Sequence, residues 1–83
     1  MTSDVNQAKL FGILSRVLGV RVESIGDLTS MQTTSEWDSL KHIEIITAME
    51  EELGVSQFSL DEIVEVTSVR KIKEVLRAKG LEI

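Results

Sequence analysis

With 83 residues, a net charge of −5 and no cysteine, the chain has room for one small domain and excludes disulfides, thiolate zinc sites and thiol nucleophiles. The acidic balance argues against nucleic-acid binding, which needs a basic face. No apolar stretch approaches the roughly 20 residues of a membrane span, and the N-terminus lacks the basic and apolar regions of a signal peptide. We therefore expect a cytoplasmic protein with no membrane partner.

The charge is unevenly distributed along the sequence. Residues 36–66 hold nine acids and one base, a sum of −8, whereas the remaining residues hold eight bases and five acids, a sum of +3. Such a run is ordinarily a solvated surface. Its alternative role is a negative face that steers basic partners.

Helical periodicity dominates the first segment of the chain. Its apolar residues recur at the spacing of one helical face: Leu10, Phe11, Leu14, Val17 and Leu18. We expect Asp4 to cap the start of this helix, with Gln7 as the reciprocal partner. Gly19 suits the left-handed conformation that ends a helix.

A long connector of residues 20–37 follows, rich in Ser, Thr and Gly. Loops of this length are uncommon in compact domains and are often functional, although a loop packed by its own side chains would look the same. Its scattered apolar residues are expected to anchor it to the core: Ile25, Leu28, Met31 and Trp37.

The second helix is predicted to run from Ser39 to Leu53 and to end at Gly54. Its core stripe consists of Ile45, Ile46, Met49 and Leu53. The sequence Ser59-Leu60-Asp61-Glu62 is a capping box and predicts a short third helix.

The fourth helix should begin near Thr67 or Ser68 and stop at Gly80. It turns four apolar residues inward: Val69, Ile72, Val75 and Leu76. The expected fold is all-α, a small four-helix bundle with three main helices and a short third one, forming a single domain over residues 1–83.

The sequence Glu36-Trp37-Asp38-Ser39-Leu40 places a serine where the connector enters the second helix. Taken alone, a serine in this setting is a helix cap. A helix start also offers free backbone N–H groups and the positive end of the helix dipole, which favour a bound or attached phosphate.

Asp38-Ser39-Leu40 at a helix start, followed by an apolar and acidic helix that closes with Glu50-Glu51-Glu52-Leu53-Gly54, resembles the acyl carrier protein family. The short acidic third helix and Val66-Thr67-Ser68-Val69 extend the resemblance. It implies that Ser39 accepts 4′-phosphopantetheine from coenzyme A, transferred by a separate Mg²⁺-dependent phosphopantetheinyl transferase. The thiol of this arm would carry an acyl group as a thioester, so the protein needs no cysteine of its own.

The resemblance also makes the second helix the surface that recognises basic patches on acyl-activating and acyl-transferring enzymes. The residues concerned are Asp38, Leu40, Lys41, Ile43, Glu44, Thr47, Glu50 and Glu51. An aliphatic cargo would fold back between the second and third helices. Together with the apolar pattern, the resemblance predicts a lining of Ile46, Met49, Phe58, Ile63 and Val66, whose other role is ordinary core packing. Carriers of this family are usually monomers.

The sequence departs from the family in three places. Lys41 and His42 follow the triplet where many fatty-acid carriers have an acid. Trp37 precedes it, and we expect its ring to fix the loop onto the bundle rather than to contact partners. The Gly-Gly pair that peptidyl carriers usually show before their serine is missing, which makes an aminoacyl or peptidyl carrier the weaker alternative.

Two further classes of function remain open. Ser39 and His42 could form a nucleophile and base, but no oxyanion hole and no orienting third group are evident, so we do not expect an enzyme. No metal site is expected either, because Glu50, Glu51 and Glu52 point in different directions around the helix. An acidic helical interaction module that is never modified is the main competitor. The identity of the cargo, and with it a role in fatty acid or polyketide biosynthesis, stays undetermined.

Overall fold

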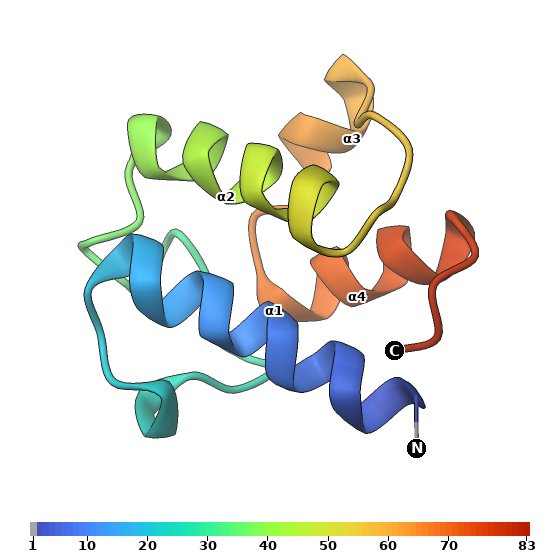
Figure 1. The fold of residues 1–83 in the computed structure, drawn as a ribbon. Helices are drawn as coiled ribbons and strands as arrows, with labels where there is room; N and C mark the ends of the chain where they lie inside the picture. The colour runs from blue at the N-terminus through green and yellow to red at the C-terminus, as the bar shows by residue number, and fades with distance from the viewer. Residues whose placement is uncertain (1) are drawn as a thin grey trace.

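The computed structural model describes residues 2–83 and consists of four α-helices and one 3₁₀ turn (Figure 1). In chain order the elements are α1 (Thr2–Leu18), η1 (Val22–Ser24), α2 (Ser39–Glu52), α3 (Leu60–Glu65) and α4 (Val69–Ala78). No strand occurs among residues 2–83, and a single isolated β-bridge joins Ser30 to Ser68. The predicted all-α bundle with a short third helix is confirmed.

The long helix α1 crosses one face of the molecule, with α2 above it and α4 beside it (Figure 1). The two chain ends lie close together in this view. Glu82 near the C-terminus accepts a hydrogen bond at its backbone carbonyl from Nδ2 of Asn6, at 2.8 Å. None of the helices among residues 2–83 is long and apolar enough to cross a bilayer.

The start of α1 differs from the prediction. The helix already begins at Thr2, so Asp4 lies in its first turn instead of capping it. A carboxylate there is still favourable, since it faces the positive end of the helix dipole. Gly19 has φ +70°, as expected for the residue that ends a helix.

The core is assembled from α1, α2, α4, the connector and the segments on either side of α3, with Ile63 of α3 packed at its edge. The predicted stripes of α1, α2 and α4 point inward. Among the apolar core residues of these helices, the sequence pattern missed Ile13 on α1 and Ala48 on α2, which are 1% and 9% exposed. Phe11 and Val17 lie at the edge of this core and are partly buried. The buried apolar side chains are Leu10, Ile13, Leu14, Leu18, Ile25, Trp37, Ile45, Ile46, Ala48, Met49, Phe58, Val66, Val69, Ile72, Val75 and Leu76.

The connector between α1 and α2 is anchored by three of its four predicted apolar residues. Ile25 and Trp37 are buried and Met31 packs against the core. The prediction for Leu28 is wrong, because its side chain is 83% exposed. The neighbouring backbone is bonded to the start of α4, which turns Leu28 toward solvent.

Side-chain caps fix the starts of α3 and α4. Ser59 and Glu62 form the predicted capping box: the Ser59 hydroxyl accepts from the Glu62 N–H, and the Glu62 carboxylate accepts from the Ser59 N–H. This bond, together with Lys79, lowers the pKa of Glu62. Ser68 caps α4 by accepting from the Lys71 N–H at 3.2 Å.

Candidate functional site

The start of α2 is capped by Asp38 and not by the serine that follows it. Asp38 has extended backbone angles, and its Oδ1 accepts a hydrogen bond from the Lys41 N–H at 2.9 Å. Ser39 is the first residue of the helix and is exposed. None of the hydrogen bonds among the described residues uses the Ser39 hydroxyl. The interpretation of Ser39 as a helix cap is therefore wrong, and its oxygen is free for chemistry.

Two features of this position suit an attached phosphate. The first N–H groups of a helix and its dipole place partial positive charge at its N-terminus. Ser39 sits on the rigid first turn, because Asp38 ties that turn down through both its side chain and its carbonyl, which accepts from the His42 N–H at 2.8 Å.

A buried hydrogen-bonded chain links this helix start to α3. Nε1 of Trp37 lies 3.0 Å from Nδ1 of His42, and Nε2 of His42 lies 2.7 Å from the carbonyl oxygen of Ile63. The indole N–H only donates, so Nδ1 must accept, and Nε2 carries the proton that it donates to Ile63. Trp37 is 2% and His42 is 7% exposed. The predicted role of the Trp37 ring in holding the loop to the bundle is confirmed.

The same hydrogen bonds prevent His42 from acting as the base of an enzymatic mechanism. Both ring nitrogens of His42 are engaged by Trp37 and Ile63, so neither has a lone pair directed at Ser39. Sequence reasoning considered His42 only as a departure from the family pattern and as a possible base for Ser39, and it missed the burial of this side chain. The signal was its spacing of three, four and seven residues from Ile45, Ile46 and Met49, which puts it on the core stripe.

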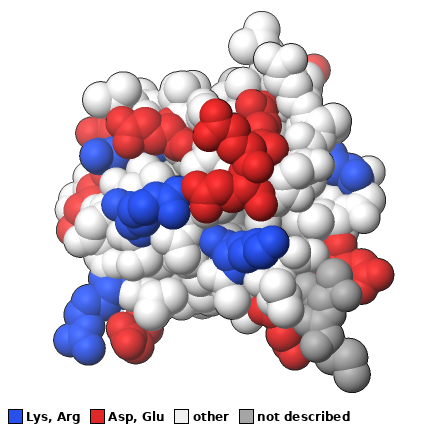
Figure 2. Space-filling model, in the orientation of Figure 1, with Lys and Arg blue, Asp and Glu red and all other residues white. Residues whose placement is uncertain are grey.

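Most of the residues predicted to recognise partners are exposed, and two of them, Lys41 and Glu50, are half-buried. Leu40 and Ile43 are 67% and 51% exposed, and Glu44, Thr47, Glu51 and Asp38 are exposed as well. Lys41 is half-buried, with its ammonium 3.9 Å from the Glu44 carboxylate. Figure 2 shows acidic side chains gathered over α2, with lysines and arginines below them along α1.

Glu50 differs from the other members of this set. Its Oε2 accepts a hydrogen bond from the Phe58 N–H at 2.8 Å, so the carboxylate holds the loop between α2 and α3 in place. Lys79 holds the same loop from α4: its ammonium donates to Ser56 Oγ and to the Gln57 carbonyl, each at 3.2 Å, and lies 4.7 Å from the centre of the Phe58 ring. This half-buried glutamate has a structural partner, which the charge pattern alone did not reveal.

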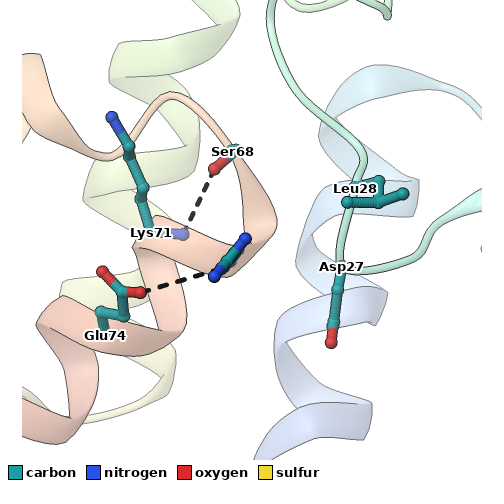
Figure 3. Close-up of a pocket in the computed structure, with 6 residues that line it drawn as sticks. Asp27, Leu28, Ser68, Lys71 and Glu74 are labelled. Atoms are coloured by element: carbon teal, nitrogen blue, oxygen red, sulfur yellow. Dashed lines mark hydrogen bonds and ion pairs between the residues drawn. The ribbon is translucent and has the colours of Figure 1, made fainter.

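The residues predicted to line an acyl pocket lie together in the interior. Ile46, Met49, Phe58 and Val66 are at most 4% exposed, and Ile63 is partly buried at the edge of the core. They are packed as core side chains in this structure. The pocket drawn in Figure 3 lies elsewhere, between the loop at Asp27 and the start of α4.

The described residues contain no group of three or more His, Cys, Asp or Glu side chains placed to hold a metal ion. The Ser39 hydroxyl stands exposed at the start of α2.

Comparison with protein-family models shows the family to which this chain belongs. A family model described as "Phosphopantetheine attachment site" matches residues 8–76, which is most of the chain. The chain belongs to this family. It is a carrier domain that bears a phosphopantetheine prosthetic group, and it is not an enzyme. A comparison with curated protein sequences gives no match.

The carrier domain also shares its fold with a solved acyl carrier protein. The holo acyl carrier protein from Geobacter metallireducens, determined by NMR in solution, superposes with a TM-score of 0.75 at 24% sequence identity. The match covers 95% of this chain and 85% of that one. The acyl-carrier-like fold inferred from the sequence is thus confirmed.

Proposed function

We propose that the carrier domain holds its phosphopantetheine arm on Ser39 and delivers an acyl group, bound to the arm as a thioester, to partner enzymes. The observation that carries the proposal is the placement of Ser39: it is exposed on the first turn of α2, and Asp38 takes the capping role that would otherwise engage its hydroxyl.

Attachment requires Ser39 Oγ to attack the phosphorus of coenzyme A that bears the pantetheine arm. A transferase would remove the hydroxyl proton, and the nucleotide would leave as a bisphosphate. His42 cannot take this proton, because both of its ring nitrogens are hydrogen-bonded. The modification therefore depends on a separate enzyme, which must approach the exposed Ser39.

Partner enzymes would dock on the exposed side of α2. Leu40 and Ile43 offer apolar contacts beside Ser39, while Glu44 and Glu51 offer carboxylates to basic patches. Long-range attraction between such faces raises the rate of encounter. The flexible arm then raises the effective concentration of its thioester in the active site of the bound enzyme.

An aliphatic cargo would enter the bundle between α2 and α3, among the side chains predicted to line it. Since these side chains are closely packed, entry requires α3 to shift. Ile63 at the edge of the core is the natural point of entry, because it is the only partly exposed member of the set. Fatty acyl or polyketide intermediates fit this apolar interior better than an amino acid with a charged amine.

Incubation of the protein with coenzyme A, Mg²⁺ and a broad-specificity transferase, followed by intact mass measurement, tests the proposal. We expect a gain of one phosphopantetheinyl group, and subsequent loading with an acyl group by a partner ligase. An unchanged mass with several transferases would instead indicate an unmodified interaction module.

A further inference from the structure

The pocket in Figure 3 is separate from the site around Ser39. It lies between the loop at Asp27 and Leu28 and the first turns of α4. Its lining consists of Asp27, Leu28, Ser68, Arg70, Lys71 and Glu74. None of these side chains belongs to the recognition helix or to the predicted acyl lining.

The loop wall of the pocket is held rigidly against α4. The Val69 N–H donates to the Thr29 carbonyl at 2.9 Å, and the Arg70 N–H donates to the Asp27 carbonyl at 3.2 Å. The buried Lys73 ammonium lies 2.8 Å from Asp27 Oδ1. These bonds occupy the first N–H groups of α4, so any ligand must be recognised by side chains.

This rigid loop presents an apolar side chain to solvent. Leu28 is 83% exposed, although both of its neighbours in the chain are held in place. Asp27 is bonded to α4, and Thr29 is bonded to α4 and to Gly26. In Figure 3 the Leu28 side chain stands across the pocket from the first turn of α4. An apolar group on a backbone that is already ordered loses little further entropy on binding, which is a property of good contact residues.

The opposite wall, on α4, carries one net positive charge, because Glu74 offsets one of the two cations Arg70 and Lys71. The Asp27 carboxylate is neutralised by Lys73, and the Glu74 carboxylate contacts only Nε of Arg70, at 4.0 Å. The two terminal nitrogens of Arg70 stay available for a carboxylate, a geometry that guanidinium groups suit well. Among the described residues Lys71 forms no ion pair, and its side chain is exposed. The pocket thus offers positive charge beside an apolar side chain, opposite in sign to the −8 segment of residues 36–66.

We propose that this pocket docks an acidic segment of a partner protein, with an apolar side chain of that segment against Leu28 and its carboxylates on Arg70 and Lys71. Binding here leaves Ser39 and α2 free, since none of their residues takes part. A partner held at α4 would therefore anchor the carrier domain while basic enzymes use α2, and it would raise the effective concentration of the carrier near them. The proposal does not require the phosphopantetheine arm, so the apoprotein and Ser39→Ala protein would bind equally well.

A peptide titration followed by NMR tests this docking site. The probe is a synthetic amphipathic peptide of about 15 residues, with leucines at helical spacing and glutamates between them. A matched peptide has lysines in place of the glutamates, and a third has serines in place of the leucines. The protein variants are Leu28→Ser and Arg70→Gln/Lys71→Gln. The control is Lys9→Gln/Arg21→Gln, which removes the same charge from exposed positions outside the pocket.

With the glutamate peptide we expect amide shifts confined to residues 27–30 and 68–74. Leu28→Ser and Arg70→Gln/Lys71→Gln should each weaken binding about tenfold, as loss of a central contact does, while the control stays within about twofold. Four results would overturn the proposal: shifts centred on α1 or α2, equal binding of the lysine peptide, unchanged affinity of Leu28→Ser, or equal shifts from the serine peptide. The last of these would indicate a simple anion site.

Discussion

Nε1 of Trp37 and Nδ1 of His42 lie 3.0 Å apart in the interior, which ties the residue before Asp38-Ser39-Leu40 to the first turn of the helix that follows it. Through Nε2 the same imidazole reaches the Ile63 carbonyl. One buried side chain therefore connects the end of α2 that carries the proposed attachment site with α3, the helix that must shift if a cargo enters the bundle.

Replacing His42 should weaken this connection. His42→Ala leaves the buried Trp37 N–H and the Ile63 carbonyl without partners, and we expect a loss of about 2–4 kcal/mol in the free energy of unfolding. Trp37→Phe keeps a ring in place and should cost about 1–2 kcal/mol. Thr47→Ala, at an exposed position of the same helix, serves as the control. Urea unfolding gives the energies, and hydrogen exchange should show faster exchange in residues 60–66 for His42→Ala. Equal protection of α3 in His42→Ala and wild type would contradict the connection.

Asp38 and Ser39 should differ in their effects on stability. Asp38→Ala removes the helix cap and should cost about 0.5–2 kcal/mol. Ser39→Ala removes an exposed hydroxyl without a hydrogen-bond partner, and we expect a change within about 0.5 kcal/mol. Thermal unfolding followed by circular dichroism measures both. A larger loss for Ser39→Ala than for Asp38→Ala would show that the serine caps the helix in solution.

Charge reversal on α2 should slow the association of partners. Glu44 and Glu51 are seven residues apart and share a helical face, and both are exposed. Glu44→Lys/Glu51→Lys should reduce the association rate with a transferase about tenfold at low salt, with a smaller effect at high salt. Glu23→Lys/Glu82→Lys makes the same change in net charge away from α2. Equal rates for both double variants would argue against α2 as the recognition surface.

Glu50 is excluded from that test because its carboxylate binds the Phe58 N–H. Glu50→Lys should lower stability by about 1–3 kcal/mol, since a buried N–H loses its acceptor. A denaturation midpoint equal to that of Glu51→Lys would contradict this structural role.

Acid should remove the contribution of Asp27 to stability. The hydrogen bond and charge of Lys73 lower the pKa of the Asp27 carboxyl from its ordinary value of 3.8. A carboxyl group whose pKa is lowered in the folded state stabilises the protein at pH values above the pKa of the unfolded state. This stabilisation is lost as the pH falls through the pKa of the folded state. Because the Asp27 side chain is 63% exposed, we expect Asp27→Asn to cost only about 1 kcal/mol at pH 7. Urea unfolding should show this difference from wild type shrinking toward zero as the pH falls below 3.8 and through the lowered pKa of the folded state. A difference that is independent of pH would rule out the ion pair as its cause.

Acylation should be visible at the residues that line the proposed cargo site. We expect methyl and ring signals of Ile46, Met49, Phe58, Ile63 and Val66 to shift between the holo and the octanoyl forms. Leu10 in α1 is equally buried and lies outside the set, so its signals are the internal reference. If Leu10 moved while those five did not, the cargo would lie on the wrong side of the bundle for this account.

Much of the fold could be predicted because its determinants are local. Apolar residues at helical spacing, the Ser59-Glu62 capping box and Gly19 each act within one or two turns of the chain, and the structure has them as expected. The exposed helix start at Ser39 follows from the same local signals.

The missed features depend on partners far along the chain. His42 is buried because it bonds to Ile63, 21 residues away, and Glu50 turns to Phe58 because of the conformation of the intervening loop. Leu28 is exposed because its neighbours bond to α4. Residue type and spacing do not encode such contacts. The helical spacing of His42 could have placed it on the core stripe but could not indicate its hydrogen bonds, and no local pattern indicates the exposure of Leu28.

The attachment of phosphopantetheine to Ser39 is the central claim, and intact mass of serine variants tests it most directly. Wild type, Ser39→Ala and Ser59→Ala are each treated with coenzyme A, Mg²⁺ and the same transferase, after circular dichroism has shown that all are folded. Ser59 also stands exposed at a helix start, so it is a matched control. We predict the gain of one phosphopantetheinyl group by wild type and Ser59→Ala, and none by Ser39→Ala. A folded Ser39→Ala protein that still gains the group would contradict the account.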